Sequence, residues 1–286
     1  MNARVPFAFL LALALSGCAT RSNQVRSNAL EFLYPNGSAA APAGDVTLEV
    51  PARVGIAFPP AKYARSTEFP EDRKQQLLEK VAAAFRGHED IASVEVIPTT
   101  YLRPEGGFED LDRVAAGFGI DLVTLVSYDQ VQFSDSTGAS LAYWTLVGAY
   151  VVKGEKNETR TMLDAAVFDL KSRALLFNAS GRSAVGGSST PIKVDKALRT
   201  ASDQGFAAAT DDLIKNLETA LAAFQEQAAK GTVRGVGTPA IALVDPQGQP
   251  LPPGEGAGAL GAVELSLALL LLACRACGRR AARSSS

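Results

Sequence analysis

Apolar runs at both ends of the chain restrict its folded domain to the middle. Val5 to Leu15 is a short apolar stretch after Arg4, and Leu260 to Ala273 is a longer one that precedes several arginines. Such segments belong to membranes and to export signals rather than to a globular core. Roughly 200 of the 286 residues therefore remain for folding, which predicts one domain rather than two.

The N-terminal segment, residues 1–17, has the three parts of an export signal: a basic start, an apolar run and small residues before a cut. It ends in Leu15-Ser16-Gly17-Cys18, which resembles a lipoprotein lipobox. The resemblance implies cleavage after Gly17 and acylation of the Cys18 thiol. Ala19 rather than aspartate follows, which implies sorting to the outer membrane. The alternative is an ordinary secreted protein that is cut nearby, with Cys18 incidental.

The C-terminal segment, residues 257–286, has the pattern of a membrane anchor with a cytoplasmic basic end. Its apolar run is about long enough to cross a bilayer, although Glu264 interrupts it. By the positive-inside rule, the following arginines hold the end in the cytoplasm, so the middle of the chain is periplasmic. Small residues come before the run and basic residues after it: Gly254, Gly256 and Gly258, then Arg275, Arg279, Arg280 and Arg283.

These glycines lower helix stability in front of the apolar run, as an intramembrane protease requires of its substrate. The arrangement resembles the GlyGly-CTERM sorting signal, which is cut by rhombosortase, a rhomboid-type protease. Together with the lipobox, it makes the chain similar to the rhombotarget lipoprotein family. The resemblance implies lipoprotein-processing enzymes, a rhomboid-type protease and membrane lipid as partners. It also implies that the tail starts in the inner membrane and is removed. A permanent transmembrane anchor is the alternative.

The remaining sequence predicts a periplasmic α/β domain over residues 45–231. Residues 18–44 are polar and rich in small residues, and they predict a flexible tether. Residues 232–256 are rich in glycine and proline and predict a linker, in which Ala240 to Val244 alone suggests an edge strand.

Within the domain, alternating and continuous apolar runs predict strands, and spaced apolar residues predict helices. The order of these elements predicts an α/β (α+β) sandwich, a mixed sheet covered by helices. It weakly resembles the small α/β domain of envelope lipoproteins such as the curli secretion component. The expected strands are 46–50, 54–58, 91–97, 120–133, 141–152, 161–170 and 174–184, with a turn at 171–173; the expected helices are 70–87, 108–116 and 194–230.

Charge and residue types exclude several classes of function. Lys plus Arg total 28 and Asp plus Glu total 30, so no global positive field attracts nucleic acid. His88 is the single histidine, and it follows a predicted helix end, where a cation is an ordinary capping residue. Cys274 and Cys277 lie in the tail, outside any folded metal or redox context. We therefore predict neither a metal site nor a cofactor.

The sequence leaves three molecular roles open. The first is a non-enzymatic lipoprotein that binds an envelope protein or another envelope component. The second is a periplasmic hydrolase that uses paired carboxylates among Asp121, Asp129, Asp164 and Asp169, which border predicted strands. The third is a subunit of an oligomeric envelope complex. Converging, poorly solvated acids in a cleft would favour the enzyme, whereas an unpaired strand would favour partner binding.

Overall fold

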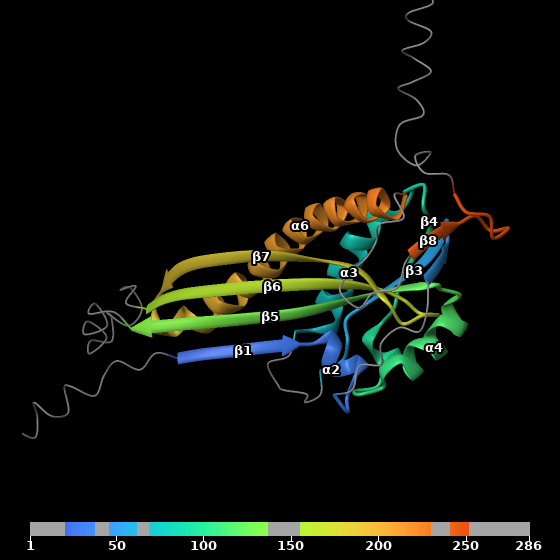
Figure 1. Ribbon diagram of the computed structural model, residues 1–286. Helices are drawn as coiled ribbons and strands as arrows, with labels where there is room; N and C mark the ends of the chain where they lie inside the picture. The colour runs from blue at the N-terminus through green and yellow to red at the C-terminus, as the bar shows by residue number, and fades with distance from the viewer. Residues whose placement is uncertain (1–20, 38–45, 62–68, 137–154, 230–240, 252–286) are drawn as a thin grey trace, which may run out of the picture.

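The computed structural model of the protein describes residues 21–37, 46–61, 69–136, 155–229 and 241–251. Its main feature is a six-stranded mixed sheet of order β4-β3-β5-β6-β7, with β1 paired to β5 (Figure 1). The elements are β1 (Arg21–Ser27), α2 (Ala29–Leu33), β2 (Val46–Glu49), β3 (Ala52–Ala57), α3 (Glu71–Phe85), β4 (Ile91–Val96), η1 (Thr99–Tyr101), α4 (Gly107–Phe118), β5 (Leu122–Ser136), β6 (Glu155–Asp169), β7 (Leu175–Ser189), η3 (Pro191–Lys193), α6 (Val194–Ala229) and β8 (Ile241–Val244).

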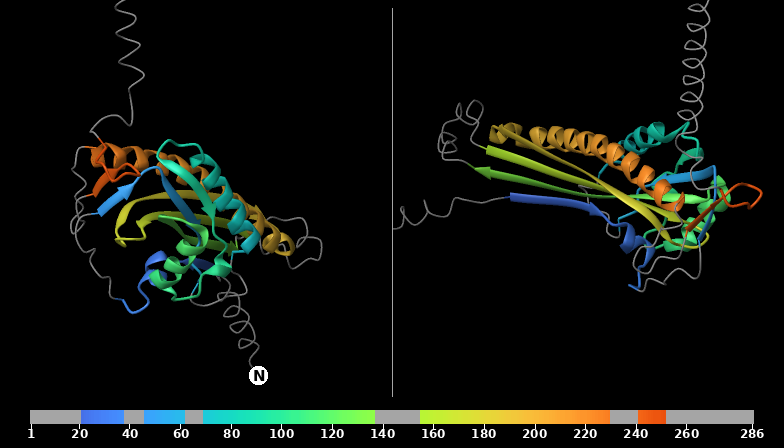
Figure 2. Two further views of the ribbon diagram at one scale, coloured as in Figure 1. Left: turned by 90° about the vertical axis from the view of Figure 1, so that its right-hand side faces the viewer. Right: turned by 45° about the horizontal axis from the view of Figure 1, so that its top comes forward.

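One end of the sheet is parallel and is wound with helices. Strand β3 pairs in parallel with β4 on one side and with β5 on the other. Helix α3 connects β3 to β4, and α4 lies on the connection from β4 to β5, on the other side of β3. Because parallel crossover connections are right-handed, the two helices lie on opposite faces of the sheet. Figure 2 shows α3 and α4 in these positions. Both helices confirm the sequence analysis, and Gly119 ends α4 in the left-handed conformation with a φ of 67°.

The other end is an antiparallel ribbon that extends past the parallel part (Figure 1). Strands β5, β6 and β7 each have 15 residues and pair in sequence, with β6 and β7 joined by the expected tight turn. The predicted strand at 141–152 lies outside the described residues, so three of the four expected late strands are observed.

Two main cores lie on opposite faces of the sheet. On one face, α3 and α6 pack on Ile56, Tyr128 and Leu163. On the other face, α2 and α4 pack on Leu125 and Phe168, but only near the parallel end. The outer face of the ribbon has no helix over it among the described residues. Met162, at 41% exposure, lies on this face. The molecule therefore has three layers at one end and two at the other.

The predicted tether over residues 18–44 is wrong for Arg21–Leu33, which form β1 and α2. Strand β1 pairs antiparallel with β5 along its whole length. Val25 is the one apolar residue of this short polar strand, so the sequence shows no alternation of apolar and polar residues. Pairing with β5, rather than burial of side chains, stabilises the strand. The described part of the linker contains the expected edge strand as β8, which pairs with β2 in a separate small sheet.

No helix within the described ranges is both long and apolar enough to cross a membrane. The predicted membrane segment at 257–286 lies outside those ranges.

Helix α6 approaches β7 closely at Gly181. A Cβ atom at this position would overlap the carbonyl oxygen of Ala209 and the backbone nitrogen of Leu213. We predict that Gly181→Ala lowers the free energy of unfolding by about 3 kcal/mol, because neither backbone can move away without repacking the core. Gly186→Ala on the same strand is the matched control, since its Cβ would meet nothing within 4 Å. Urea denaturation measures both variants, and equal stabilities would contradict the prediction.

Candidate functional site

The lipobox residues Leu15, Ser16, Gly17 and Cys18 and the tail residues Gly254, Gly256, Gly258, Arg275, Arg279 and Arg280 all lie outside the described residues. The described chain does, however, begin only three residues after Cys18, at the first residue of β1. The ribbon, to which β1 belongs, is therefore the described part of the domain that follows Cys18 most closely in the chain.

The N-terminal half of α6 rests on the ribbon through a layer of polar side chains. Gln130 donates from Nε2 to Thr161 Oγ1 at 2.7 Å and accepts from Ser202 Oγ at 2.6 Å. Gln132 donates from Nε2 to the carbonyl oxygen of Leu198 at 2.7 Å. Gln130 and Thr161 are buried, and buried amides of this kind need directional partners. The layer therefore holds α6 at a defined distance and register above the strands.

A cleft of about 720 Å³ lies between β1, β5, the start of α3 and the N-terminal half of α6. We call it the β1 cleft. Asn23 and Val25 of β1 line one side of it. Phe69 and Phe206 stack with their ring centroids 3.8 Å apart and form part of its apolar wall. The cleft therefore offers apolar and polar lining surfaces next to β1.

An ion pair joins the two helices beside this cleft. Arg73 of α3 lies 3.5 Å from Asp203 of α6, and both residues line the cleft. Arg199 and Asp72 are also among the lining residues, so charges of both signs are present. Such a lining suits a polypeptide ligand better than a simple ion.

Strand β1 is paired on one side only. Its seven residues form a ladder with β5, and no described strand pairs with its other edge. At the opposite border of the ribbon, β7 is covered by α6: the backbone nitrogen of Arg182 donates to Asp212, and Asn216 donates to the carbonyl oxygen of Ser180. Within the described ranges, the ribbon therefore has one protected edge and one edge with backbone groups available for pairing.

The four predicted carboxylates do not form one site. Asp121 accepts two hydrogen bonds from the Arg53 guanidinium, at 3.0 and 2.8 Å, next to the parallel end of the sheet. Asp169 accepts from the backbone nitrogen of Ser172 at 2.8 Å and so stabilises the turn between β6 and β7. These two residues have structural roles.

Asp129 and Asp164 lie on the same outer face of the ribbon. The register pairs Asp129 with Met162 and Asp164 with Ser127, so the two carboxylates occupy diagonal positions on neighbouring strands. Asp129 accepts from Gln24 at 2.9 Å. Burial raises the pKa of Asp164, while a hydrogen bond from Asn178 acts in the opposite direction. Neither carboxylate lines the β1 cleft. The two carboxylates therefore share a sheet face and do not converge in that cleft.

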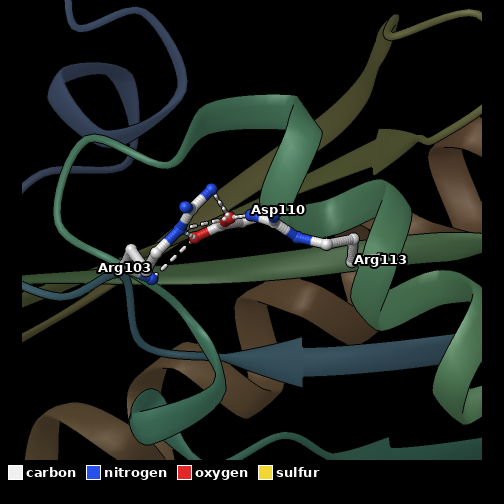
Figure 3. Close-up of polar contacts among 3 residues, drawn as sticks. All are labelled: Arg103, Asp110 and Arg113. Carbon is white, nitrogen blue, oxygen red and sulfur yellow. Dashed lines mark hydrogen bonds and ion pairs between the residues drawn. The ribbon is translucent and has the colours of Figure 1, made fainter.

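Asp110 is a buried carboxylate that the sequence analysis did not single out. It is 1% exposed and contacts two arginines, Arg103 and Arg113, as Figure 3 shows. The Arg103 guanidinium donates at 2.7 Å, and the backbone nitrogen of Arg103 donates at 2.6 Å. The carboxylate therefore closes the loop in front of α4, which is a structural role. The spacing of Asp110 and Arg113 on a helix was visible in the sequence, but the burial was not.

His88 follows α3 as expected, and its backbone nitrogen donates to the carbonyl oxygen of Phe85 at 3.3 Å. In the part of the chain that the structure describes, no three His, Cys, Asp or Glu side chains are grouped to hold a metal ion. Nothing in this geometry assigns a catalytic role to His88.

Two aspartates should respond to pH in opposite ways. The Arg53 guanidinium lowers the pKa of Asp121, so this residue stabilises the fold above the unfolded-state pKa of about 3.9 and loses that contribution as the pH falls. The pKa of Asp164 is raised, so its ionisation destabilises the fold as the pH rises. Near neutral pH we expect Asp121→Asn to lower the urea midpoint and Asp164→Asn to raise it. Both differences from the unsubstituted protein should shrink towards about pH 3. If the urea midpoints of the variants and of the unsubstituted protein changed with pH in parallel, the assignment would be contradicted.

No protein-family model matches the chain, and no curated protein matches it significantly. Among solved structures, the PelC dodecamer from Paraburkholderia phytofirmans has 16% sequence identity and a TM-score of 0.27, and the match covers 69% of this chain and 96% of that chain. A leucine-to-methionine variant of the same dodecamer has 17% identity and a TM-score of 0.26, with 70% and 96% covered. TM-scores this low establish no shared fold and carry no conclusion about function.

Proposed function

We propose that this chain is an exported envelope lipoprotein that is acylated at Cys18, shortened at its C-terminal tail by a rhomboid-type protease, and binds a partner protein at β1 without catalysing a reaction. The lipobox and the tail motif support the processing. The observation that carries the binding role is the open edge of β1, because an extended polypeptide can add to such an edge through backbone hydrogen bonds.

The β1 cleft adds specificity to this mode of binding. Asn23 and Val25 line it, so a strand added beside β1 would place alternate side chains near its lining. The domain then acts at the periplasmic side of the cell envelope, with the outer membrane as its destination.

The processing prediction is tested by intact-mass analysis of the protein purified from growing cells. We expect acyl chains on Cys18 and loss of the residues that follow the glycines Gly254 to Gly258. In a strain without the rhomboid-type protease, the mass should increase by that of the missing tail, because the apolar segment is no longer cut. An unacylated chain would contradict lipidation, and an unchanged mass in the protease-deficient strain would contradict the sorting tail.

The binding prediction is tested by single prolines in β1. Backbone groups of successive strand residues point to opposite edges, so one of Asn23→Pro and Gln24→Pro removes a donor to β5 and the other removes a donor at the open edge. We expect one variant to lose about 1–3 kcal/mol of stability. The other proline variant should keep its stability but bind the partner less well. A photocrosslinking residue in place of Ser22 should then no longer form covalent adducts with the partner in cells.

The same photocrosslinker at Arg182 is the control, because α6 covers that edge of the ribbon. Adducts of equal yield at both positions, or adducts at Ser22 that survive both prolines, would show that β1 is not a strand-addition site.

A further inference from the structure

A second cleft, of about 580 Å³, lies between the end of β7 and the start of α6. We call it the α6 cleft. Gly186 and Gly187 form part of one wall, and Ala197 and Ala201 form part of the other. These small residues leave space between the helix and the strand. The two clefts lie on opposite sides of α6, because the helix residues that line one cleft lie about half a turn away from those that line the other.

Among the described residues, the lining of the α6 cleft is basic and contains no acidic residue. Lys193 and Lys196 line it, and in the described part of the chain neither forms an ion pair. The N-terminus of a 36-residue helix begins here, which adds a partial positive charge. Asp195 offsets part of this charge, but it lines the other cleft. The α6 cleft is therefore complementary to an anion.

Buried hydroxyl groups line the same cleft. Thr190 is 5% exposed, and its Oγ1 has no hydrogen-bond partner among the residues that the structure describes. Ser189 is also buried, and its Oγ is occupied as an acceptor from Asn157 Nδ2 at 2.9 Å. A buried donor without an acceptor carries a desolvation cost that a bound oxyanion would remove. These groups are an observation separate from the helix terminus, and they point to an acceptor ligand.

The register places this cleft beside the start of β1. Arg21 is paired with Ser134, Ser134 with Asn157, and Asn157 with Gly187, so one row crosses the ribbon from β1 to the α6 cleft. Four strands span about 14 Å. Figure 2 shows the starts of β1 and α6 at the same end of the molecule. Cys18 is three residues from Arg21, which allows about 10 Å of extended chain.

We propose that this end of the ribbon faces the lipid headgroups and that the α6 cleft binds the phosphate of an anionic phospholipid. The inference rests on the proposed acylation of Cys18. With only about 10 Å between the acylated residue and the sheet, the domain has no long tether and must sit with the Arg21–Gly187 row near the bilayer surface. Lys193 and Lys196 then meet the headgroup layer, and the buried Thr190 belongs to the lining of the cleft.

The orientation is tested on protein whose acylation and shortened C-terminus have been verified by mass. In a background with Cys274→Ser and Cys277→Ser, nitroxide labels are placed at Ser188→Cys or at Lys171→Cys, which are about 45 Å apart along the hairpin. We expect a headgroup-bound paramagnetic chelate to relax the label at position 188 strongly and the label at 171 weakly. Equal or reversed effects overturn the orientation while leaving acylation intact; an unacylated mass instead overturns the proposed function.

The cleft is tested by titration with short-chain phosphatidylglycerol, short-chain phosphatidylcholine and inorganic phosphate. We expect amide chemical-shift changes at Thr190 and Lys193 with phosphatidylglycerol. Lys193→Gln together with Lys196→Gln should weaken binding about 25-fold, since each basic side chain near an anionic lipid contributes about fivefold. The control, Lys171→Gln with Lys215→Gln, removes the same charge elsewhere and should have no effect.

Thr190→Val separates binding from folding. Because Oγ1 has no partner among the described residues, the substitution breaks no hydrogen bond there, and we expect equal or slightly higher stability together with weaker phosphatidylglycerol binding. Shift changes with inorganic phosphate but not with the lipid would overturn the headgroup assignment. An equal response to phosphatidylcholine would overturn the anion selectivity, and no response to any probe would overturn the site.

Discussion

The packing of α6 on the ribbon is the contact on which the rest of the structure depends. The helix has 36 residues and lies over β6 and β7 along most of its length. Its middle part is anchored in the core by Phe206, Leu213 and Leu217, where Gly181 allows the backbones to approach closely. Its first part is held by hydrogen bonds from Gln130 and Gln132. Burial supplies the stability of this contact, and the polar layer supplies its register.

This division accounts for the two open clefts at the ribbon end. Where the contact is apolar, side chains interdigitate and leave only a small apolar cavity of about 100 Å³ between α3, α6 and the sheet. Where it is polar and its neighbours are glycine or alanine, the helix stands off and leaves a cleft on each side. Both clefts lie at the ribbon end, where β1 also begins. The tapering of the fold from three layers to two thus brings the edge of β1 and the basic cleft together in one region.

Several elements followed from local pattern alone. The amphipathic spacing of Leu78 and Val81 predicted α3, and Pro70 and Gly87 marked its limits, because these residues act within one helical turn. The hairpin of β6 and β7 was predicted from two apolar runs around a polar turn. By contrast, β1 was assigned to a tether. Its partner β5 lies about 100 residues away in sequence, and a solvated polar strand has no pattern of its own.

The candidate sites show the same limit. The spacing of Asp129 and Asp164 in sequence does not reveal that they share one face; the register of β5 and β6 decides it. Lys193 and Lys196 look like ordinary helix residues until the wall of glycines on β7 is placed opposite them. Asp110 was passed over because burial of a carboxylate depends on neighbours such as Arg103, which comes from the loop before α4.

The sequence by itself determined the processing expectations and the type and approximate limits of most helices and strands, because these depend on residues that are neighbours along the chain. Only the tertiary structure decided where the domain begins, which strand edge stays open, and which side chains share a cleft. Those properties depend on pairing between strands that are far apart in sequence. The free energy of this pairing depends on the residues of both strands together, so neither segment predicts it alone.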